Sequence, residues 1–151
     1  MVVIEGRTWL ELIPPEGCEN HLRQERVGRV AVVVDDTPEI FPVNYVADGT
    51  DIYFRTDKGT KLEAVLNHPK IAFEIDGIDE ERHLGWSVLA IGPAHRVVGA
   101  DRLRHVATLG LEPWAAGEKA YFVHMVPTRI SGRRIHTSTR PARADAAGVG
   151  R

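Results

Sequence analysis

Residues 42–67 have the sequence PVNYVADGTDIYFRTDKGTKLEAVLN. β-Branched and aromatic residues are frequent on both sides of Asp48-Gly49, and Asp-Gly is a common hairpin turn. We therefore expect two antiparallel strands, at residues 40–46 and 51–56, joined at that turn. Side chains alternate across a strand, so the even-numbered residues of the second strand share one face.

A short helix is predicted directly after this hairpin. Thr60 and Glu63 match the capping-box pattern, in which a threonine at the cap is followed three residues later by a glutamate. The helix ends near Asn67, because Pro69 disfavours the helical conformation of the residue before it. The stretch thus predicts a strand, a hairpin turn, a second strand and a helix.

The remaining chain adds strands without a regular strand–helix alternation. Further strands are predicted at residues 28–34, 70–76, 86–96, 121–126 and 128–135, and further helices at residues 15–26 and 99–109. Pro42 indicates a strand edge or bulge. Bends are expected at Gly92-Pro93 and at Pro127. A parallel sheet needs a helix between successive strands, and most strands here are joined by short turns. We therefore expect a mainly β fold with α insertions, an antiparallel β-barrel.

Length and composition indicate one domain. The chain has 151 residues and a mass of 16.7 kDa, with 43% hydrophobic and 26% charged residues, which are ordinary globular values. We assign residues 1–136 to the domain. Residues 137–151 are small and polar without periodicity, and we expect a disordered tail there.

Charge and cysteine content exclude several classes of protein. The formal net charge is −2, and the arginine-rich residues 129–143 lack interleaved aromatic residues, so no nucleic-acid partner is expected. No apolar run is long enough to span a membrane, and the N-terminus lacks a secretion-signal pattern. Cys18 is the single cysteine, so no internal disulfide forms. These features predict a cytoplasmic protein without a membrane partner.

The end of the second strand and the start of the helix combine positive charge with hydroxyl groups. The residues concerned are Arg55, Thr56, Lys58, Thr60 and Lys61. A helix N-terminus adds unpaired backbone N–H groups and partial positive charge. Together they suit a phosphate dianion, although a solvated basic cluster would have the same composition.

Two further positions have two interpretations each. Asn44 stands in an apolar strand, where it would bind the polar edge of a flat ring or satisfy neighbouring backbone. Trp86 and Ser87 offer a ring face and a hydroxyl to a ligand, but a tryptophan at the start of a strand equally suits core packing.

The order and spacing of several segments resemble one known family. The segments are RVGRVAVV, PVNY, DGTDIYFRTDKGTKLEAVLNHPKIAFEID, GWSVLAIGPA, EPWAAG and PTRISGRRI, which extend from about Cys18 to Ile135. They resemble the pyridoxamine 5′-phosphate oxidase-like flavoproteins, and most closely the short FMN-binding branch. The resemblance implies a split β-barrel that forms a homodimer, with one flavin in each of two clefts between the subunits.

The resemblance also implies a set of FMN contacts. Thr56 and Lys61 would hold the phosphate, with Arg55 and Thr60 beside them. The ring and the ribityl chain would contact Pro42, Val43, Asn44 and Tyr45. Trp86 and Ser87 would supply further contacts, which in this family often come from the partner subunit.

The sequence departs from the full-length oxidases of this family in two places. Lys61 is followed by Leu62 where those enzymes have a second basic residue. Their C-terminal substrate-binding arginine and histidine are matched only loosely by Arg134 and His136. We therefore do not expect oxidation of pyridoxamine phosphate.

The resulting hypothesis is an FMN-dependent oxidoreductase that passes a hydride between the flavin and an unidentified small molecule. One alternative is a reductase of the same fold that uses the deazaflavin F-420, whose longer anionic tail would need further basic residues such as Arg129, Arg133 and Arg134. Another is a non-catalytic flavin-binding or flavin-sensing protein. No catalytic residue is predicted, and candidates for the substrate side are Tyr45, Trp114, Tyr121 and His124.

The seven histidines do not form a metal-ligand pattern. No two of them are spaced as a helical i, i+4 pair, and no HExxH or CxxC motif is present. We therefore expect no metal site. His124 lies within an apolar strand, where a histidine is commonly satisfied by neighbours in a core or an interface.

Overall fold

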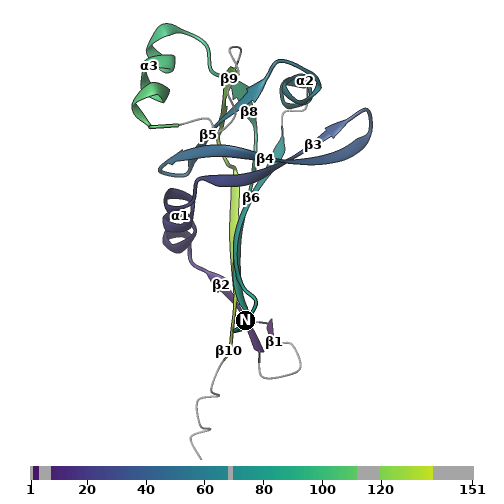
Figure 1. Ribbon diagram of the computed structural model, residues 1–151, viewed down its shortest axis with the longest axis vertical. Helices are drawn as coiled ribbons and strands as arrows, with labels where there is room; N and C mark the ends of the chain where they lie inside the picture. The colour runs from purple at the N-terminus through teal and green to yellow at the C-terminus, as the bar shows by residue number, and fades with distance from the viewer. Residues whose placement is uncertain (1, 4–7, 68–69, 112–119, 138–151) are drawn as a thin grey trace, which may run out of the picture.

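A computed structural model describes residues 2–3, 8–67, 70–111 and 120–137 of the chain. Figure 1 shows long strands with helices at their sides. The helices are α1 (Pro15–Gln24), α2 (Thr60–Asn67) and α3 (Ala100–Thr108). The strands are β1 (Val2–Val3), β2 (Thr8–Ile13), β3 (Val27–Val34), β4 (Thr37–Asp48), β5 (Asp51–Asp57), β6 (Ile71–Asp79), β7 (Leu84–Gly92), β8 (Ala94–Arg96), β9 (Ala120–Met125) and β10 (Arg129–Thr137).

The strands form one sheet in the order β1-β2-β10-β7-β6-β3-β4-β5-β9-β8. Every pairing that the structure describes is antiparallel. The expected mainly β, antiparallel fold with α insertions is thus confirmed. The described helices and strands after residue 14 lie within a few residues of the predicted ranges.

Turn chemistry explains the β3–β4 hairpin. Asp35 and Asp36 have φ angles of 48° and 61°, as in the two-residue turns that suit the twist of a hairpin. β4 then pairs with β3 through residues 37–44 and with β5 through residues 45–48. Pro42 lies in the segment of β4 that pairs with β3 and not with β5. Its missing N–H therefore removes no hydrogen bond to β5.

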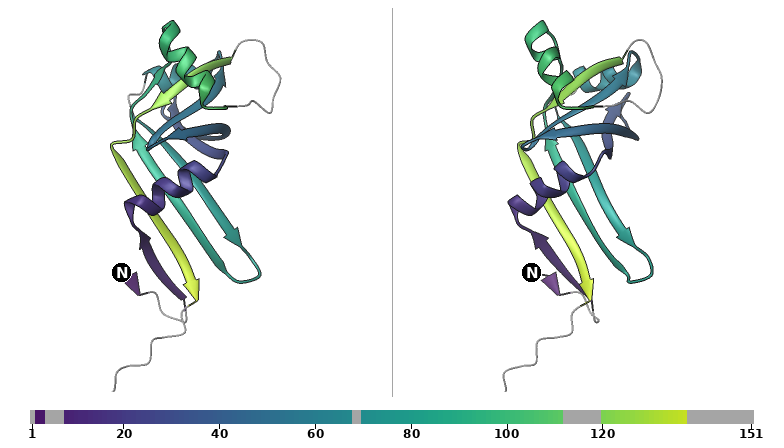
Figure 2. Two further views of the ribbon diagram at one scale, coloured as in Figure 1. Left: turned by 90° about the vertical axis from the view of Figure 1, so that its left-hand side faces the viewer. Right: turned by 60° about the vertical axis from the view of Figure 1, so that its left-hand side comes forward.

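Two adjacent bends divide the sheet, as the prolines predicted. β7 passes into β8 at Gly92-Pro93, and β9 passes into β10 at Pro127. The Val126 N–H donates to the Pro93 carbonyl over 3.0 Å. A Cβ on Gly92 would lie 2.3 Å from the Val126 carbonyl oxygen, so only glycine fits this close approach. The result is a long sheet of β2, β10, β7 and β6, crossed by α1, and a shorter sheet of β4, β5, β9 and β8 (Figure 2).

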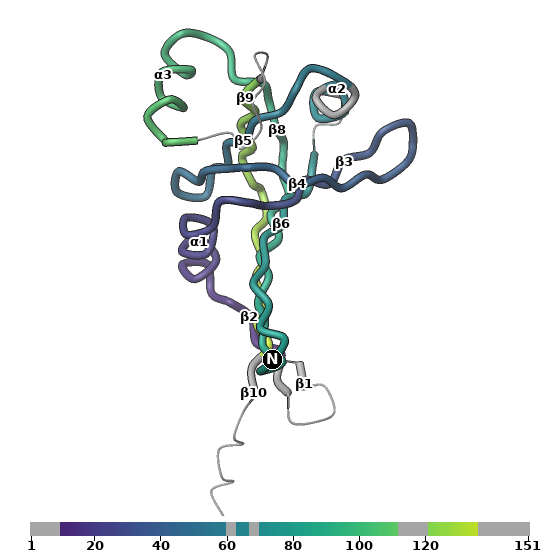
Figure 3. Tube along the Cα trace, viewed as in Figure 1, coloured from purple at the N-terminus to yellow at the C-terminus, as the bar shows by residue number. Residues whose placement is uncertain are grey.

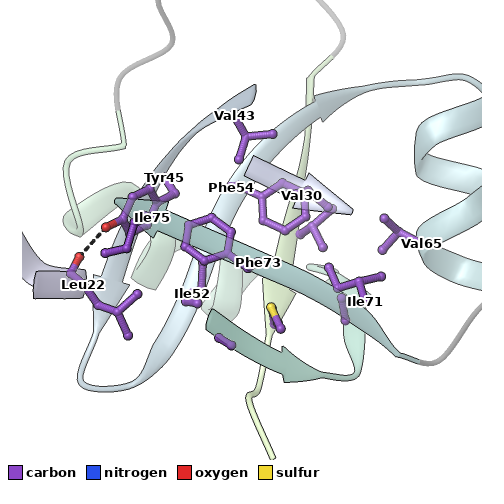
Figure 4. Packing of buried hydrophobic residues seen from close by; sticks show 14 of the residues in the cluster. Leu22, Val30, Val43, Tyr45, Ile52, Phe54, Val65, Ile71, Phe73 and Ile75 are labelled. Atoms are coloured by element: carbon purple, nitrogen blue, oxygen red, sulfur yellow. Dashed lines mark hydrogen bonds between the residues drawn. The ribbon is translucent and has the colours of Figure 1, made fainter. Parts of the chain in front are cut away.

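The main core fills the space between the two sheets. Figure 4 shows Phe54, Phe73 and Tyr45 packed together there, and the first two are fully buried. The Tyr45 hydroxyl donates to the Leu22 carbonyl over 2.7 Å, which ties β4 to α1. Cys18 and Leu22 are buried one turn apart on α1, as its sequence predicts.

The helices α2 and α3 pack on opposite faces of the shorter sheet, and Figure 3 shows them apart at one end of the molecule. Ala64 and Val65 of α2 join the main core. Val106 of α3 joins a smaller cluster with Val46 and Tyr53 on the other face. The two faces of β5 are therefore covered by different helices.

Some expectations fall outside the description, and two strands were not predicted. The loop at residues 112–117 and all but the first residue of the expected tail lie outside the described residues. Residue 137 ends β10. The strands β1 and β2 were not foreseen, and β2 pairs with β10. No helix in the described ranges is long and apolar enough to cross a membrane.

Candidate functional site

The corner between β5 and α2 has the predicted backbone arrangement with one shift. β5 ends at Asp57 and α2 begins at Thr60. The Glu63 N–H donates to the Gly59 carbonyl over 3.1 Å, so Gly59 occupies the cap position. The predicted capping box beginning at Thr60 is therefore wrong by one residue. Thr60 and Lys61 are the first two helical residues, in the turn whose N–H groups have no acceptor within a helix.

Alternation along β5 separates the predicted phosphate residues. Thr56 lies on the face that carries Ile52 and Phe54, which belong to the main core. Arg55 lies on the other face, with its guanidinium 5.6 Å from the centre of the Phe122 ring. The structure therefore brings Thr56 to the α2 face of the sheet and Arg55 to the α3 face.

Arg55 has an unsatisfied donor. Its Nε is buried, and no acceptor lies within hydrogen-bond distance among the described residues. A buried donor of this kind costs free energy unless a partner satisfies it, so a ligand carrying acceptor atoms fits this position. β4 and β5 pair Tyr45 with Phe54. If this register is extended by one residue, Asn44 lies beside Arg55 on the same face of the sheet.

The residues of β4 also divide between the two faces. Val43 and Tyr45 point into the main core, and Tyr45 is 1% exposed. Burial raises the pKa of the Tyr45 phenol, which stays a neutral donor to Leu22. The expectation that Tyr45 lines the ring or the substrate side therefore fails for its side chain in this structure, and a ligand there would meet the main chain. Pro42 is exposed and Asn44 half-buried on the outer face.

Trp86 and Ser87 lie on β7, in the long sheet. Trp86 pairs with Gly77 on β6 and with Arg134 on β10. Its ring stacks on His21 of α1, with ring centres 3.7 Å apart, and packs against the main core. Within one chain, Trp86 and Ser87 therefore lie away from the corner between β5 and α2.

Sequence reasoning missed Arg96 as a candidate. Its guanidinium lies over the Tyr121 ring, 3.9 Å from the centre, and Tyr121 is the cross-strand partner of Thr56. This contact brings a cation to the end of β5 that carries Thr56. Residues 86–96 were predicted as one bent strand, which hid the pairing of β8 with β9. Residues 94–96 show no apolar–polar alternation that would mark a separate strand.

His124 is satisfied by neighbours, as expected. Its Nε2 lies 2.8 Å from Asp51 Oδ2, and its ring stacks on Tyr53. Within the described ranges, no three histidine, cysteine or acidic side chains gather in a way that could hold a metal ion. Trp114 lies outside the described residues.

The three arginines considered for a longer anionic ligand lie on β10. Arg129 and Arg133 are exposed, and the Nε of Arg134 forms an ion pair with Glu11 over 3.2 Å. The charge of Arg134 is therefore partly engaged within the chain.

The fold and this corner define a small antiparallel-sheet protein with a candidate anion site. A family model described as pyridoxamine 5′-phosphate oxidase matches residues 14–134. The chain therefore belongs to the pyridoxamine 5′-phosphate oxidase family.

Individual relatives agree with this assignment. The structure of an FAD binding protein from Mycobacterium smegmatis is similar with a TM-score of 0.71 and 36% sequence identity, covering 82% of this chain and 98% of that one. A conserved protein of unknown function from Corynebacterium diphtheriae gives a TM-score of 0.70 and 36% identity, covering 82% and 96%. An uncharacterized Mycobacterium tuberculosis protein is 30% identical over 99 residues, which is 66% of this chain and 88% of that protein.

Proposed function

We propose that this protein binds FMN, with the phosphate at the N-terminus of α2, and acts as a flavin-dependent oxidoreductase on a small molecule. One observation carries the proposal. The Mycobacterium smegmatis relative, 36% identical and matched over 98% of its length, is described as an FAD binding protein. FAD and FMN share the isoalloxazine ring, the ribityl chain and its 5′-phosphoryl group. The corner between β5 and α2 offers the donors that such a phosphoryl group requires.

In this proposal the phosphate is bound by the first turn of α2 and by residues beside it. The backbone N–H groups of residues 60–62 point out of the helix start, where the helix dipole favours an anion. The Thr56 hydroxyl and the Lys61 ammonium would bind the phosphate, and Thr60 would assist them; the side chains of residues 60 and 61 lie outside the described part of the structure. Arg96 adds a cation over Tyr121, opposite Thr56.

The ring and the ribityl chain are assigned to the outer face of β4 and β5. Pro42 and Asn44 present their side chains on that face, while Val43 and Tyr45 contribute main chain. The buried Arg55 Nε has no acceptor among the residues that the structure describes. A hydrogen bond from Arg55 to a ring or ribityl oxygen would remove the cost of burying it.

A bound flavin supplies two-electron redox chemistry by exchanging a hydride with a substrate at its N5. The residues of this chain orient the ring and leave one ring face open to the substrate. Positive charge from Arg55 would stabilise negative charge that develops on the reduced ring. The proposal needs no side-chain nucleophile.

The proposal includes a split-barrel homodimer with the flavin between the subunits. Trp86 and Ser87 lie on β7, outside the β5–α2 corner of their own chain, so a second copy would supply these contacts. Replacing Trp86 by alanine is expected to weaken both the dimer and FMN binding. Sedimentation with and without FMN measures the two effects, and an unchanged dimer would limit Trp86 to packing on His21.

The direct test is to identify the ligand that purifies with the protein. Mass spectrometry of the extracted ligand, together with an absorbance band near ~450 nm, is expected to show a flavin. Titration of the ligand-free protein with FMN, FAD, riboflavin and F-420 then ranks the candidates. FMN binding tighter than riboflavin supports a phosphate site. Preference for F-420, or failure to bind any of the four, contradicts the proposal.

A further inference from the structure

A cavity lies on the α3 face of the shorter sheet, and Arg96 of the proposed phosphate site also lines it. Its volume is about 510 Å³, within the range of small-molecule pockets. Residues of β5, β8, β9 and α3 line it, including Tyr53, His95, Val97, Arg102, His105 and His124. Ala64 and Val65 of α2 pack on the opposite face of these strands, so the sheet lies between α2 and the cavity. Arg55, which the proposed function assigns to the flavin ring, is on the same face as the cavity but does not line it.

Apolar and aromatic side chains line the inner part of this cavity. Tyr53 and Val97 are each 7% exposed and belong to the smaller hydrophobic cluster. The Tyr53 and His124 rings are stacked, with centres 4.4 Å apart and planes 5° from parallel. The His105 ring meets Tyr53 edge-on at 6.1 Å. A planar ring placed on these side chains would bury apolar area and continue the stacking.

Two carboxylates hold the histidines in place. Asp51 Oδ2 lies 2.8 Å from His124 Nε2, and Asp48 Oδ2 lies 3.0 Å from His105 Nε2. Asp48 and Asp51 are cross-strand partners on either side of the hairpin turn. Each carboxylate accepts the Nε2 proton, which leaves Nδ1 of each ring as the nitrogen that can bind a further partner. Asp48 and Asp51 therefore each have a hydrogen-bond partner within the chain.

Positive charge at the cavity comes from arginine side chains. The third carboxylate there, Asp101, accepts a hydrogen bond from Arg104 on the next turn of α3. Arg96 and Arg102 also line the cavity, and within the described ranges no carboxylate forms an ion pair with Arg102. Burial raises the pKa of Tyr53, and the charges of Asp51 and Asp48 act in the same direction, whereas the charge of Arg102 lowers it.

We propose that this cavity binds a small planar organic anion of the aromatic carboxylate class, with its ring on the Tyr53–His124 layer and its carboxylate toward Arg102. An apolar lining with a stacked ring pair selects an aromatic body. An arginine without an ion-pair partner at the rim selects a carboxylate, which accepts two parallel hydrogen bonds from one guanidinium. The proposal goes beyond the flavin site and does not depend on it.

Sodium benzoate is the probe, and the uncharged amide benzamide is its comparison compound. Both are titrated into the purified full-length protein at low ionic strength, and backbone amide shifts are followed by NMR. Benzoate is expected to shift the amides of Tyr53, Val97 and Arg102, and to bind about ten-fold more tightly than benzamide. Absence of these shifts at millimolar benzoate, or equal binding of the two compounds, overturns the proposal.

Two arginine variants test the charged partner. Arg102→Ala is expected to weaken benzoate about ten-fold, because it removes the charged partner of the carboxylate. Arg82→Ala removes an exposed arginine that pairs with Asp79 and does not line the cavity, and should change the affinity by less than about two-fold. Equal losses in the two variants would show attraction by net charge alone and contradict the site.

A third variant tests the cavity without changing charge. Val126 lines the cavity and is 38% exposed at its edge, so Val126→Trp can fill the space with little effect on the core. It should abolish the benzoate shifts while the rest of the amide spectrum stays folded. Unchanged benzoate affinity in this folded variant would contradict binding in the cavity.

Discussion

The two faces of β5 are stabilised by different kinds of contact. The inner face carries Ile52 and Phe54, both fully buried in the main core by contacts with apolar neighbours. The outer face carries Asp51, Tyr53 and Arg55. Asp51 is hydrogen-bonded to His124, Tyr53 stacks on the His124 ring, and Arg55 makes a cation–π contact with Phe122. One strand therefore supplies packing on one side and polar chemistry on the other, because side chains alternate along it.

The largest expected effect separates the two faces by stability. Phe54→Ala removes a fully buried ring from the main core and should lower the free energy of unfolding by about 3–5 kcal/mol. Tyr53→Phe is the control on the outer face, since it keeps the ring and removes one hydroxyl, and should cost less than ~1 kcal/mol. Urea unfolding measures both. Equal losses would contradict the division into a packing face and a polar face.

A second prediction extends the comparison to the joint between the two sheets. Gly92→Ala places a Cβ 2.3 Å from the Val126 carbonyl oxygen and 2.8 Å from Pro127 Cα, which are backbone atoms of the other bend. The backbone must shift, with an expected loss of about 1–3 kcal/mol in unfolding free energy. Gly85→Ala, whose Cβ would stay 3.3 Å from its nearest neighbour, is the milder control. A neutral Gly92→Ala would show that the bends are not tightly apposed.

A third prediction concerns Tyr45, which the family resemblance placed beside the flavin. Tyr45→Phe leaves the buried Leu22 carbonyl without its donor and should cost about 1–2 kcal/mol of stability. FMN affinity should be unchanged, because the phenol points into the core. Thermal unfolding and FMN titration of the same variant separate the two effects. Weaker FMN binding at unchanged stability would show that the Tyr45 hydroxyl contacts the ligand.

The smallest expected effect is a pH dependence at the stack of His21 on Trp86. Burial first, and then the charge of Arg134, lower the pKa of His21 in the folded protein. The unfolded chain therefore binds more protons just below the ordinary value of about 6.5, and stability falls as pH decreases through that range.

The measurement is the free energy of unfolding between about pH 8 and about pH 5, in the wild type and in His21→Gln. The variant should lose less stability on acidification than the wild type. Identical pH profiles would show that His21 titrates alike in the folded and unfolded chain.

Local patterns were enough to predict most of the described strands and helices. The Asp48-Gly49 turn, the alternation of residues 51–56 and the prolines at 93 and 127 are local signals. Each of them can be read from a few consecutive residues. The strand β2 lacked such a signal, because its pairing with β10 joins residues near opposite ends of the chain. The cap of α2 moved by one residue because boundaries depend on individual backbone hydrogen bonds.

The candidate site was predictable in its residue types and less so in its geometry. Charge and hydroxyl groups around Arg55 and Lys61 were visible in the sequence. The opposite orientation of Arg55 and Thr56 follows from strand alternation. The contacts of Arg96 with Tyr121 and of His124 with Asp51 needed the tertiary pairing of β9 with its two neighbours, which no local pattern reveals.

The central claim is that the corner between β5 and α2 binds the phosphate of FMN. The affinities of FMN and riboflavin, which differ by that phosphate, are measured in the wild type and in Lys61→Ala, with Lys70→Ala, an exposed lysine outside the corner, as the control. The wild type and Lys70→Ala should prefer FMN by about ten-fold or more, and Lys61→Ala should lose most of this preference. A preference for FMN that persists undiminished in Lys61→Ala would contradict the account.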